Sequence, residues 1–580
     1  MNSLPNDIPS GAPSESSAKP GKPDLGAILR KARKHLPLIL CALAALLALS
    51  LCIYFIVGPA EGYFHADCTD SLLWAEATYD AGRIFNPDFN YAALLPFGAS
   101  LWLVPLIAVF GVTMTTHVIG MVIFALLFLA SIIVLCRKMK WSYAAAFGTS
   151  ALLLLILSSS EKLREIMWNH VIYYSLGLLL YFFALALTFF AWEALERADK
   201  KPVLRFLPLA GLFVFVALSA TNGFQMLVLT VVPVCAGVFL ERLFDRETPL
   251  ASRKNIPPLL VLVVSVAGVL IGTVILKSLL GGISSGYATA YSRYSSTSEW
   301  ASNLDKFFMN WLTLLGMDVA KTDELFTLDS IVNILRIGVS LLLLIVPLVG
   351  LCCYKRIDSR YTRVLLIGHT FLFAFLFFGC VCGRLAAANW RLVPLVGSAI
   401  LTTVALVREA WTHRQTAICT VRGGVLVLVV LALLSSYNAK LIADMPFDYG
   451  RDNELHRLAE RLESEGLSYG YATFWRSQSI TLLSDSAVKC REILVKNDKD
   501  DLWGITTDHY QSSLKWYEDQ EGVDEYFVLL SGSEYQTIAL SDYWVDLNKR
   551  AYVRDFMAEG YYVFVFSENI WGAEAEDRIY

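Results

Sequence analysis

Long apolar blocks, separated by short polar connections, dominate the chain between residues 36 and 437. Most of them come close to the roughly 20 residues that a helix needs to cross a bilayer. The pattern therefore predicts eleven membrane-spanning helices. They are Leu36–Val57, Thr115–Cys136, Ser142–Leu157, Val171–Trp192, Val203–Ala220, Phe224–Leu240, Leu259–Leu276, Ile331–Tyr354, Val364–Cys382, Leu392–Val407 and Gly424–Tyr437.

One further apolar block, Tyr91–Val112, is long enough to span a membrane but is interrupted by proline and glycine. Proline removes a helical hydrogen bond, and such breaks suit a helix that lies in the membrane interface. Counting the block as a span would also invert every later connection. We therefore expect it to lie on the outer surface.

The charges of the connections predict which side each one occupies. Basic residues gather in alternate connections, and cytoplasmic loops are the ones enriched in Lys and Arg. The rule places the N-terminus in the cytoplasm and the C-terminus outside. The segment before the first span, residues 1–35, is rich in Pro, Ser and Gly, which predicts a disordered tail. The basic connections contain Arg137/Lys138/Lys140, Arg197/Lys200/Lys201/Arg205, Arg242/Arg246/Arg253/Lys254, Lys355/Arg356/Arg360/Arg363 and Arg408/Arg414/Arg422.

Composition agrees with a multi-pass membrane protein, since 56% of the 580 residues are hydrophobic and only 17% are charged. Residues 36–440 form the predicted transmembrane domain. Residues 441–580 differ, with 27 acidic and 13 basic side chains. Short apolar runs at Tyr469–Phe474, Glu525–Leu530 and Tyr561–Phe566 predict strands, and Asn453–Glu463 and Tyr535–Arg550 predict helices. We expect a soluble extracytoplasmic α/β domain.

Two carboxylates, Asp67 and Asp70, follow the first span closely. They belong to the first outer segment, residues 58–114, which is strongly acidic. An acidic pair beside a bilayer must face water, a cavity or a substrate, so it is a candidate functional site. A solvated loop or a helix cap is the alternative.

The residues around this pair resemble a known family. Asp70-Ser71, Trp74-Ala75, Gly82, Pro87 and Phe110-Gly111-Val112 follow one another as related motifs do in the GT-C superfamily of membrane glycosyltransferases. The resemblance is to the branch with the protein mannosyltransferases and aminoarabinose transferases, and it covers roughly residues 30–410. Ser71 stands where that branch usually has Glu, and Leu95-Pro96-Phe97 replaces a more proline-rich sequence.

The resemblance implies a mainly α, multi-pass enzyme that transfers a sugar on the outer face of the membrane. The donor would be a sugar linked to polyprenyl phosphate, and the acceptor a glycan, lipid or protein of the cell envelope. Nucleic acid has no part in this chemistry. Asp70 would be the catalytic base, and Asp67 would either support it or hold a divalent cation, Mg²⁺ or Mn²⁺.

Two later outer connections supply further candidates. Glu161, Glu165, Asn169 and His170 precede the fourth span, where family members line the sugar site; an ion-pair patch at a helix end is the alternative. Arg384 and Arg391 precede the tenth span, and a guanidinium suits a lipid phosphate. Interfacial arginines that reach toward water are the alternative there.

Two other functional classes remain open on the sequence alone: a transporter or flippase of envelope glycolipid precursors, and a non-catalytic membrane scaffold. The sequence has no nucleotide-binding loop. Cys352-Cys353 and Cys380-Val-Cys382 lack the spacing of a zinc site. Cys68 and Cys490 lie in outer segments, and a disulfide between them is an open alternative.

Overall fold

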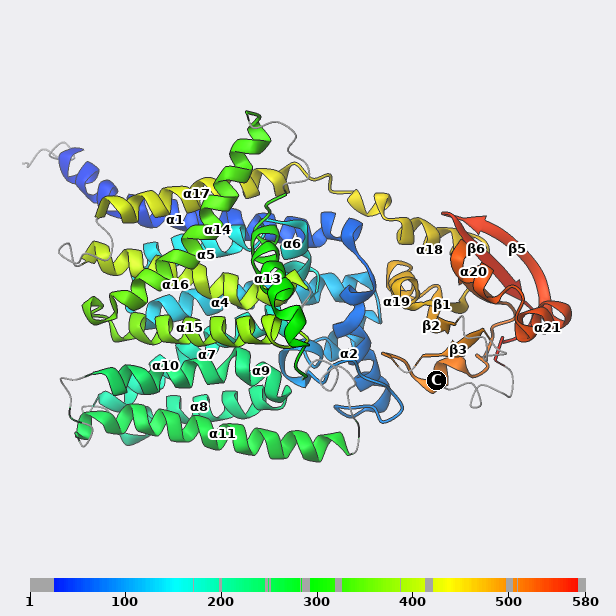
Figure 1. Cartoon of the computed structure of the whole chain (residues 1–580), viewed down its shortest axis with the longest axis horizontal. Coiled ribbons are helices and arrows are strands. Elements are labelled where there is room, and N and C mark those ends of the chain that lie inside the picture. The colour runs from blue at the N-terminus through cyan, green and yellow to red at the C-terminus, as the bar shows by residue number, and fades with distance from the viewer. Residues whose placement is uncertain are drawn as a thin grey trace, which may run out of the picture.

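The computed structural model describes residues 25–170, 172–197, 201–245, 249, 252–281, 283, 293–318, 326–385, 388–412, 421–496, 504–508 and 510–571. A bundle of long helices forms one end of the molecule, and a domain with a mixed sheet forms the other (Figure 1). This architecture confirms the predicted fold class. The predicted N-terminal tail lies outside the described residues up to residue 24. The disorder predicted over residues 25–35 is wrong, because these residues form the first turns of α1 (Leu25–Val57).

Nine helices in the described part of the chain contain stretches long and apolar enough to cross a membrane, and two bent helix pairs raise the number to eleven. The eleven correspond to the eleven predicted blocks. The nine helices are α1 (Leu25–Val57), α4 (Met114–Lys138), α7 (Tyr173–Glu196), α8 (Pro202–Ala220), α11 (Ile256–Leu280), α14 (Leu328–Cys352), α15 (Arg360–Val381), α16 (Val393–Thr412) and α17 (Val421–Ala443).

The two bent pairs have different shapes. Helices α9 (Gly223–Leu229) and α10 (Val231–Phe244) meet at 42°. Pro233 explains this break, because its ring excludes the carbonyl of Leu229 and it has no N–H to donate. Helices α5 (Tyr143–Ile156) and α6 (Glu161–Trp168) meet at 117°, so α6 turns sharply away from the direction of α5.

The predicted basic connections converge on the end of the bundle away from the sheet domain. Arg360 forms an ion pair with Glu196, and Arg363 lies 3.1 Å from Glu241. Lys140, from an earlier connection, lies over the ring of Tyr361. Connections far apart in sequence therefore share one end, as the charge pattern requires. That this end is cytoplasmic stays a prediction.

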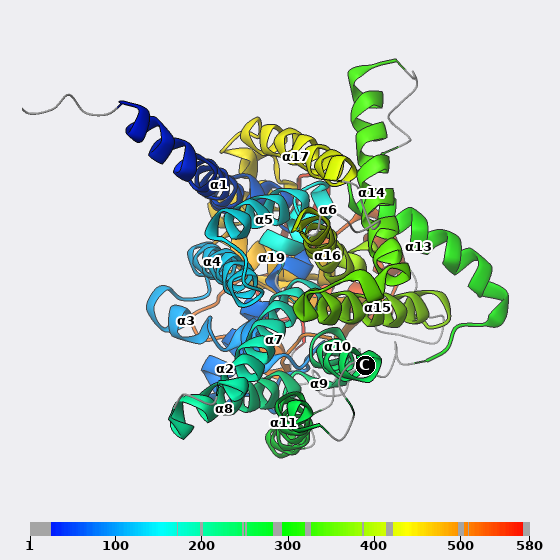
Figure 2. The same ribbon diagram turned by 90° about the vertical axis from the view of Figure 1, so that its left-hand side faces the viewer.

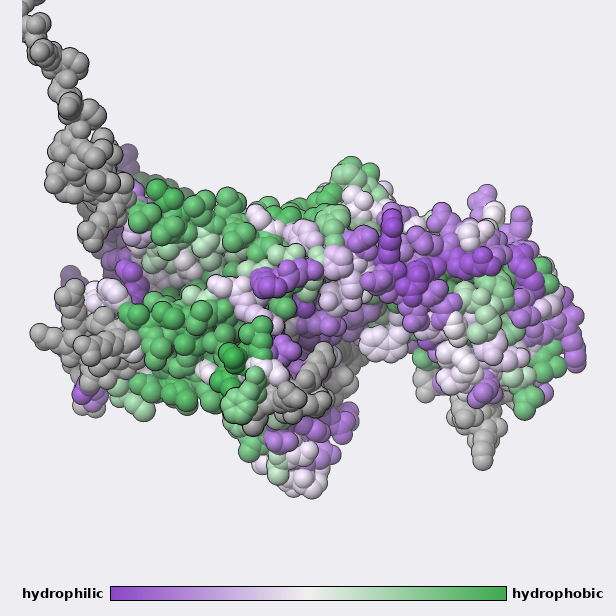
Figure 3. All heavy atoms as spheres, turned by 90° about the horizontal axis from the view of Figure 1, so that it is seen from above, coloured by the Kyte–Doolittle hydropathy of each residue, from purple (hydrophilic) through white to green (hydrophobic). Residues whose placement is uncertain are grey.

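Helices α7 and α16 lie at the centre of the bundle, which Figure 2 shows end-on. Their apolar residues are almost wholly buried, whereas α1 and α11 face outward. Leu259, Val263 and Val266 of α11 are all more than half exposed. On the face that Figure 3 shows, apolar side chains form a belt across the helices, while polar side chains predominate on the sheet domain. Such a belt is the surface that a lipid bilayer covers.

The first outer segment forms short elements at the end of the bundle that faces the sheet domain. They are η1 (Pro59–Tyr63), η2 (Ala66–Thr69), α2 (Asp70–Ala81), η3 (Pro96–Ser100) and α3 (Val104–Phe110). The block Tyr91–Val112 makes no span, because Phe97 and Gly98 have non-helical backbone angles and α3 has only seven residues. The expectation that this block is not a span is confirmed.

The C-terminal domain has six strands in the order β3-β2-β1-β4-β6-β5. Strand β1 runs parallel to β2 and β4, and the remaining pairs are antiparallel. Helices α18 (Glu454–Ser464), α19 (Phe474–Leu483), α20 (Gly532–Ile538) and α21 (Asp542–Ala551) accompany the sheet. The strands are β1 (Tyr469–Thr473), β2 (Lys489–Val495), β3 (Ile505–Thr507), β4 (Tyr526–Leu530), β5 (Tyr552–Ala558) and β6 (Tyr561–Phe566).

The three predicted strands are present as β1, β4 and β6. The single helix predicted over Tyr535–Arg550 is wrong, because the chain forms α20 and α21 instead. Ser541 separates them, and its side chain accepts a hydrogen bond from the backbone N–H of Trp544. A serine in this position caps a new helix and so favours the break.

The C-terminal domain rests directly on the first outer segment. Phe64, Cys68 and Leu72 share one apolar cluster with Leu458 and Phe527 of the domain. Three acidic residues of the segment also meet bases of the domain: Glu61 with His456 (2.8 Å), Glu76 with Arg491 (3.5 Å) and Asp88 with Lys515 (2.8 Å). The acidic segment is thus partly neutralised by a domain that is itself acidic overall.

Candidate active site

Asp70 lies at the start of α2, where the outer connections and the C-terminal domain meet. It is 6% exposed, and its Oδ2 lies 3.4 Å from Nε2 of His170, the residue that follows α6 and Asn169. Its carboxylate contacts groups from other segments, and the residue before it, Thr69, makes no side-chain cap. Thr69, and not Asp70, therefore occupies the cap position of α2, and a functional role for Asp70 stays a prediction.

The C-terminal domain supplies the other contact to Asp70. Nε2 of Gln511 donates a hydrogen bond of 2.6 Å to Asp70 Oδ1, and the Gln511 carbonyl oxygen accepts one of 2.9 Å from the indole of Trp74. All three side chains are buried. Gln511 has a φ of 53°, a left-handed conformation that only the surrounding structure can hold. The domain thus places a neutral amide against the candidate base.

This environment changes the protonation of the carboxyl group. Burial raises the pKa of Asp70, and the hydrogen bonds from His170 and Gln511 offset only part of that rise. The charge of Asp67 raises the pKa further. A carboxylate with a raised pKa holds a proton more strongly and is a better general base than an ordinary aspartate. Asp67 itself is half-buried one turn earlier in η2.

The residues of the second predicted cluster, which lie on α6 and directly after it, do not all come together. Glu165 is buried and lies 2.8 Å from Nε2 of His65 and 2.7 Å from Nζ of Lys162. Glu161 is exposed at the start of the helix. Asn169 links two other segments: its side-chain oxygen lies 2.9 Å from Nε2 of His117 in α4, and its side-chain nitrogen donates a hydrogen bond of 3.0 Å to the carbonyl of Ala60. His170 is therefore the member that contacts Asp70.

The two arginines of the third predicted cluster also differ in their surroundings. Arg391 is buried in η7 (Asn389–Leu392), whereas Arg384 is exposed. The neighbouring Trp390 lies under the ammonium group of Lys162, which is 4.6 Å from the centre of its ring. Lys162 therefore lies beside η7, the short helix that also carries Arg391. Arg384 lies apart from this arrangement in sequence and exposure.

Strand β2 brings two charged residues that the sequence did not identify. Arg491 is buried, pairs with Glu76 and stacks on Trp516 at 4.2 Å. Glu492 is wholly buried; burial raises its pKa well above the ordinary range, and its contact with Asp508 and the charge of Asp70 add to the rise. Adjacent charged residues within a short apolar stretch are the sequence feature that could have identified Arg491 and Glu492 as candidates.

A polar cavity of about 720 Å³ separates α2 from this part of the C-terminal domain. The first outer segment contributes carboxylates and Arg83 to its walls, and the domain contributes bases and an aromatic ring. The lining residues include Glu76, Asp80, Arg83, Lys489, Arg491 and Trp516. Both Asp70 and Glu76 belong to α2, and six residues of helix rise by about 9 Å. The cavity thus begins along the helix that carries the candidate base.

A metal ion at Asp67 remains a prediction. In the part of the chain that the structure describes, three potential ligands come together only at His65, Cys68 and Glu165. The first two residues lie close to Asp67 in sequence, but the sequence reasoning missed them because their third partner follows almost 100 residues later. Cys68 and Cys490 are both free thiols, so the disulfide considered between them is absent.

No family model matches the chain, and no curated protein matches it. Solved structures are similar to it. ArnT from Cupriavidus metallidurans, bound to undecaprenyl phosphate, is 12% identical over 92% of this chain and 98% of its own, with a TM-score of 0.49. The archaeal oligosaccharyltransferase AglB from Archaeoglobus fulgidus, with an inhibitory peptide and a dolichol-phosphate, is 11% identical over 92% of this chain and 74% of its own, with a TM-score of 0.39.

A second structure of the Archaeoglobus fulgidus oligosaccharyltransferase, in complex with Zn and sulfate, is 13% identical over 90% of this chain and 72% of its own, with a TM-score of 0.41. ArnT and AglB are both GT-C glycosyltransferases, the class that the motifs around Asp70 resemble. Because each TM-score is below 0.5, the function proposed below rests on this chain's own residues.

Proposed function

We propose that this multi-pass membrane protein is a glycosyltransferase that moves a sugar from a polyprenyl-phosphate-linked donor to an envelope acceptor on the outer face of the membrane. The observation that carries the proposal is the burial of Asp70 between His170 and Gln511, at the point where outer connections and the C-terminal domain meet. The motif around Asp70 supports the same reaction class.

In the proposed reaction, an acceptor hydroxyl attacks the anomeric carbon of the sugar. The bond between that carbon and the phosphate oxygen breaks, and polyprenyl phosphate leaves with the bonding electrons. Asp70 takes the proton of the acceptor hydroxyl, for which its raised pKa suits it. His170 orients the carboxylate through its contact with Oδ2.

The departing phosphate needs positive charge near it. Lys162 and Arg391 are the candidates, because Lys162 lies over Trp390 and Arg391 is the next residue in η7. A guanidinium can contact two phosphate oxygens at once, whereas an ammonium acts as a point charge. We therefore assign Arg391 to the phosphate and Lys162 to its surroundings.

We further propose that the acceptor enters through the polar cavity beside α2. Its mixed charges and the ring of Trp516 suit a hydroxyl-rich molecule, because an aromatic face packs well against the C–H face of a sugar. The C-terminal domain would then select the acceptor, and the transmembrane domain would hold the lipid donor.

The substitution Asp70→Asn tests the proposal in cells whose own copy of the chain has been removed. It keeps the shape of the side chain but cannot accept the proton. We expect polyprenyl-linked sugar to accumulate in lipid extracts analysed by mass spectrometry, and the corresponding envelope sugar to disappear. Asp444→Asn is the matched control, since Asp444 is exposed beside Lys440 at the end of α17.

Normal transfer by Asp70→Asn, at wild-type levels of the protein in the membrane, would contradict the assignment of the base. The same experiment separates the other functional classes. If the cells lacking the chain show unchanged lipid-linked sugars and envelope glycans, the result supports a non-catalytic scaffold. If the sugar-lipid changes sides of the membrane without being consumed, the flippase alternative gains.

A further inference from the structure

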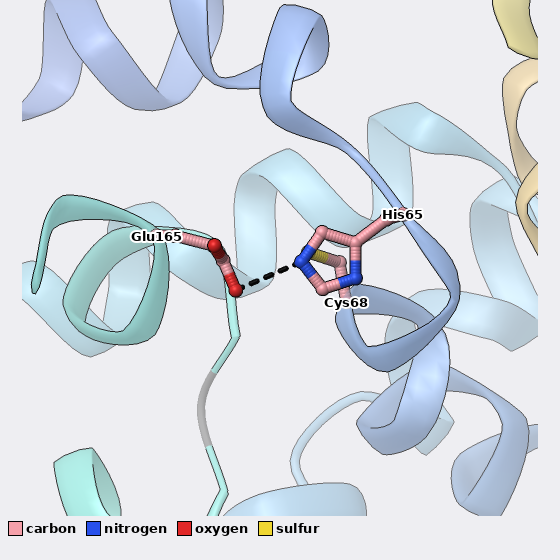
Figure 4. Close-up of side chains that lie close together, drawn as sticks. All are labelled: His65, Cys68 and Glu165. Carbon is pink, nitrogen blue, oxygen red and sulfur yellow. Dashed lines mark ion pairs between the residues drawn. The ribbon is translucent and has the colours of Figure 1, made fainter. Parts of the chain in front are cut away.

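Three potential metal ligands from two outer connections meet beside the candidate active site. His65 and Cys68 belong to the first outer segment and Glu165 belongs to α6, and their side chains converge (Figure 4). Nε2 of His65 lies 2.8 Å from Oε1 of Glu165, and the ligand atoms of all three residues lie within 4.8 Å of one another. Cys68 is 2% exposed and Glu165 is 6% exposed, so solvent reaches neither freely.

The local structure explains how His65 and Cys68 come together. His65 caps the 3₁₀ helix η2, and Cys68 is the third residue of that helix. A 3₁₀ helix has three residues per turn, so side chains three positions apart lie on the same side. The sequence His-x-x-Cys therefore forms one arm of the cluster, and α6 supplies the other.

The donor set indicates which ion would bind. A thiolate and an imidazole favour zinc and related transition metals, whereas Mg²⁺ and Mn²⁺ prefer oxygen ligands. In a tetrahedral zinc site the ligand atoms are about 3.3–3.7 Å apart, given bonds of roughly 2.0–2.3 Å. The observed cluster needs shifts of only about 1 Å to reach that geometry. We propose that His65, Cys68 and Glu165 bind Zn²⁺ or a similar transition-metal ion, with a fourth position open.

The charges of the cluster support this proposal. On binding, Cys68 gives up its thiol proton, and the resulting thiolate and the Glu165 carboxylate together balance the two positive charges of the ion. The ion takes the position of the proton on Nε2 of His65, which moves to Nδ1. The 3.3 Å contact in which Asp67 N–H donates to Nδ1 is then lost. Without the ion, Lys162, 2.7 Å from the same oxygen of Glu165, supplies the balancing charge.

The position of the cluster gives the ion a structural consequence. Cys68 precedes Asp70 by two residues, and Glu165 precedes His170 by five. An ion held by both segments fixes the distance between Asp70 and His170, which already lie 3.4 Å apart. The site differs from a metal at Asp67 or Asp70, and its occupancy does not depend on sugar transfer.

Metal binding by the purified full-length protein in detergent tests the site. After treatment with a chelator, the protein is titrated with Co²⁺, a spectroscopic substitute for Zn²⁺, and its zinc content is measured separately after addition of Zn²⁺. We expect about one ion per chain and an absorption band from a thiolate bound to Co²⁺. Cys68→Ser should remove that band, and Glu165→Gln should weaken binding at least about 10-fold while keeping the side-chain shape.

Two matched controls use the same substitutions elsewhere. Cys352→Ser replaces an exposed cysteine at the end of α14. His456→Gln replaces a histidine that forms a similar 2.8 Å pair with Glu61, and His65→Gln is its counterpart in the cluster. Both controls should bind the ion like the wild type, and His65→Gln should not.

The wild-type spectrum decides the case even where a variant fails to fold. If the wild type binds neither Zn²⁺ nor Co²⁺ in stoichiometric amount, the proposed site is wrong. The cluster would then be a metal-free contact of Glu165 with His65 and Lys162. A thiolate band that persists in Cys68→Ser would likewise overturn it, because another cysteine would then be the ligand. Neither outcome depends on whether the protein transfers a sugar.

Discussion

Gln511 gives the sharpest test of how the C-terminal domain acts on the candidate base. Its amide donates to Asp70 Oδ1 at 2.6 Å, and a hydrogen bond to a charged group contributes about 1.5–3 kcal/mol. This bond favours the ionised form of Asp70 and therefore lowers its pKa. Gln511→Ala removes this bond and should therefore raise the pKa of Asp70 further.

The expected consequence is a change in the pH dependence of transfer. A base must be ionised, so activity falls as the pH drops through its pKa, and the acidic limb of the kcat/KM profile should move to higher pH. The assay measures consumption of polyprenyl-linked sugar by the full-length protein across pH. Alanine adds no new strain at the φ of 53°, because both residues carry a Cβ.

Gln536→Ala is the control for this measurement, because Gln536 is exposed on α20 and makes no part of the site. Its pH profile should match that of the wild type. An acidic limb that stays in place in Gln511→Ala, or that moves to lower pH because water enters the vacated space, would refute the reasoning. A uniform loss of rate at every pH would show that Gln511 only supports folding.

Three further predictions concern separate parts of the molecule. Because the pKa of Glu492 is raised in the folded state, the stability tied to its protonated form is complete at low pH and is lost as the pH rises through that raised pKa. The melting temperature of Glu492→Gln should therefore fall less than that of the wild type between acidic and alkaline pH. Trp516→Ala should raise the KM for the acceptor with little change in kcat, which steady-state kinetics measure. Gly237→Val should destabilise the bundle by about 1–3 kcal/mol, since an added Cβ would lie 2.6 Å from the carbonyl oxygen of Val364. Gly211→Val, where a Cβ meets no atom within 4 Å, should leave the melting temperature unchanged.

The membrane fold was largely predictable from the sequence because lipid imposes a local rule. Each span must satisfy its own backbone hydrogen bonds and expose apolar side chains, so eleven apolar blocks correspond to eleven helices or bent pairs. Even the bend at Thr230 has a local cause, the proline three residues later. The same local rule explains why the block Tyr91–Val112 forms no span, since its proline and glycine residues interrupt the helix.

The site was less predictable because its contacts join distant parts of the chain. Gln511 meets Asp70 across 441 positions, and no local pattern marks a glutamine in a loop as a partner. Strand β2 was missed for a related reason, because Arg491 and Glu492 interrupt its apolar pattern. Their partners, among them Glu76 in the first outer segment, lie mostly outside the sheet, so only the folded structure explains two buried charges in one strand.

The charges around the first outer segment explain why its acids differ in role. Glu61, Glu76 and Asp88 each meet a base of the C-terminal domain, and these contacts tie the two domains together. Asp70 instead meets the neutral amide of Gln511 and the imidazole of His170. A fixed cation in that position would favour the carboxylate and lower its pKa, leaving a weaker base. Because the amide is neutral, burial keeps the pKa of Asp70 raised. The C-terminal domain thus pairs the other acids of the segment with bases but leaves Asp70 able to accept a proton.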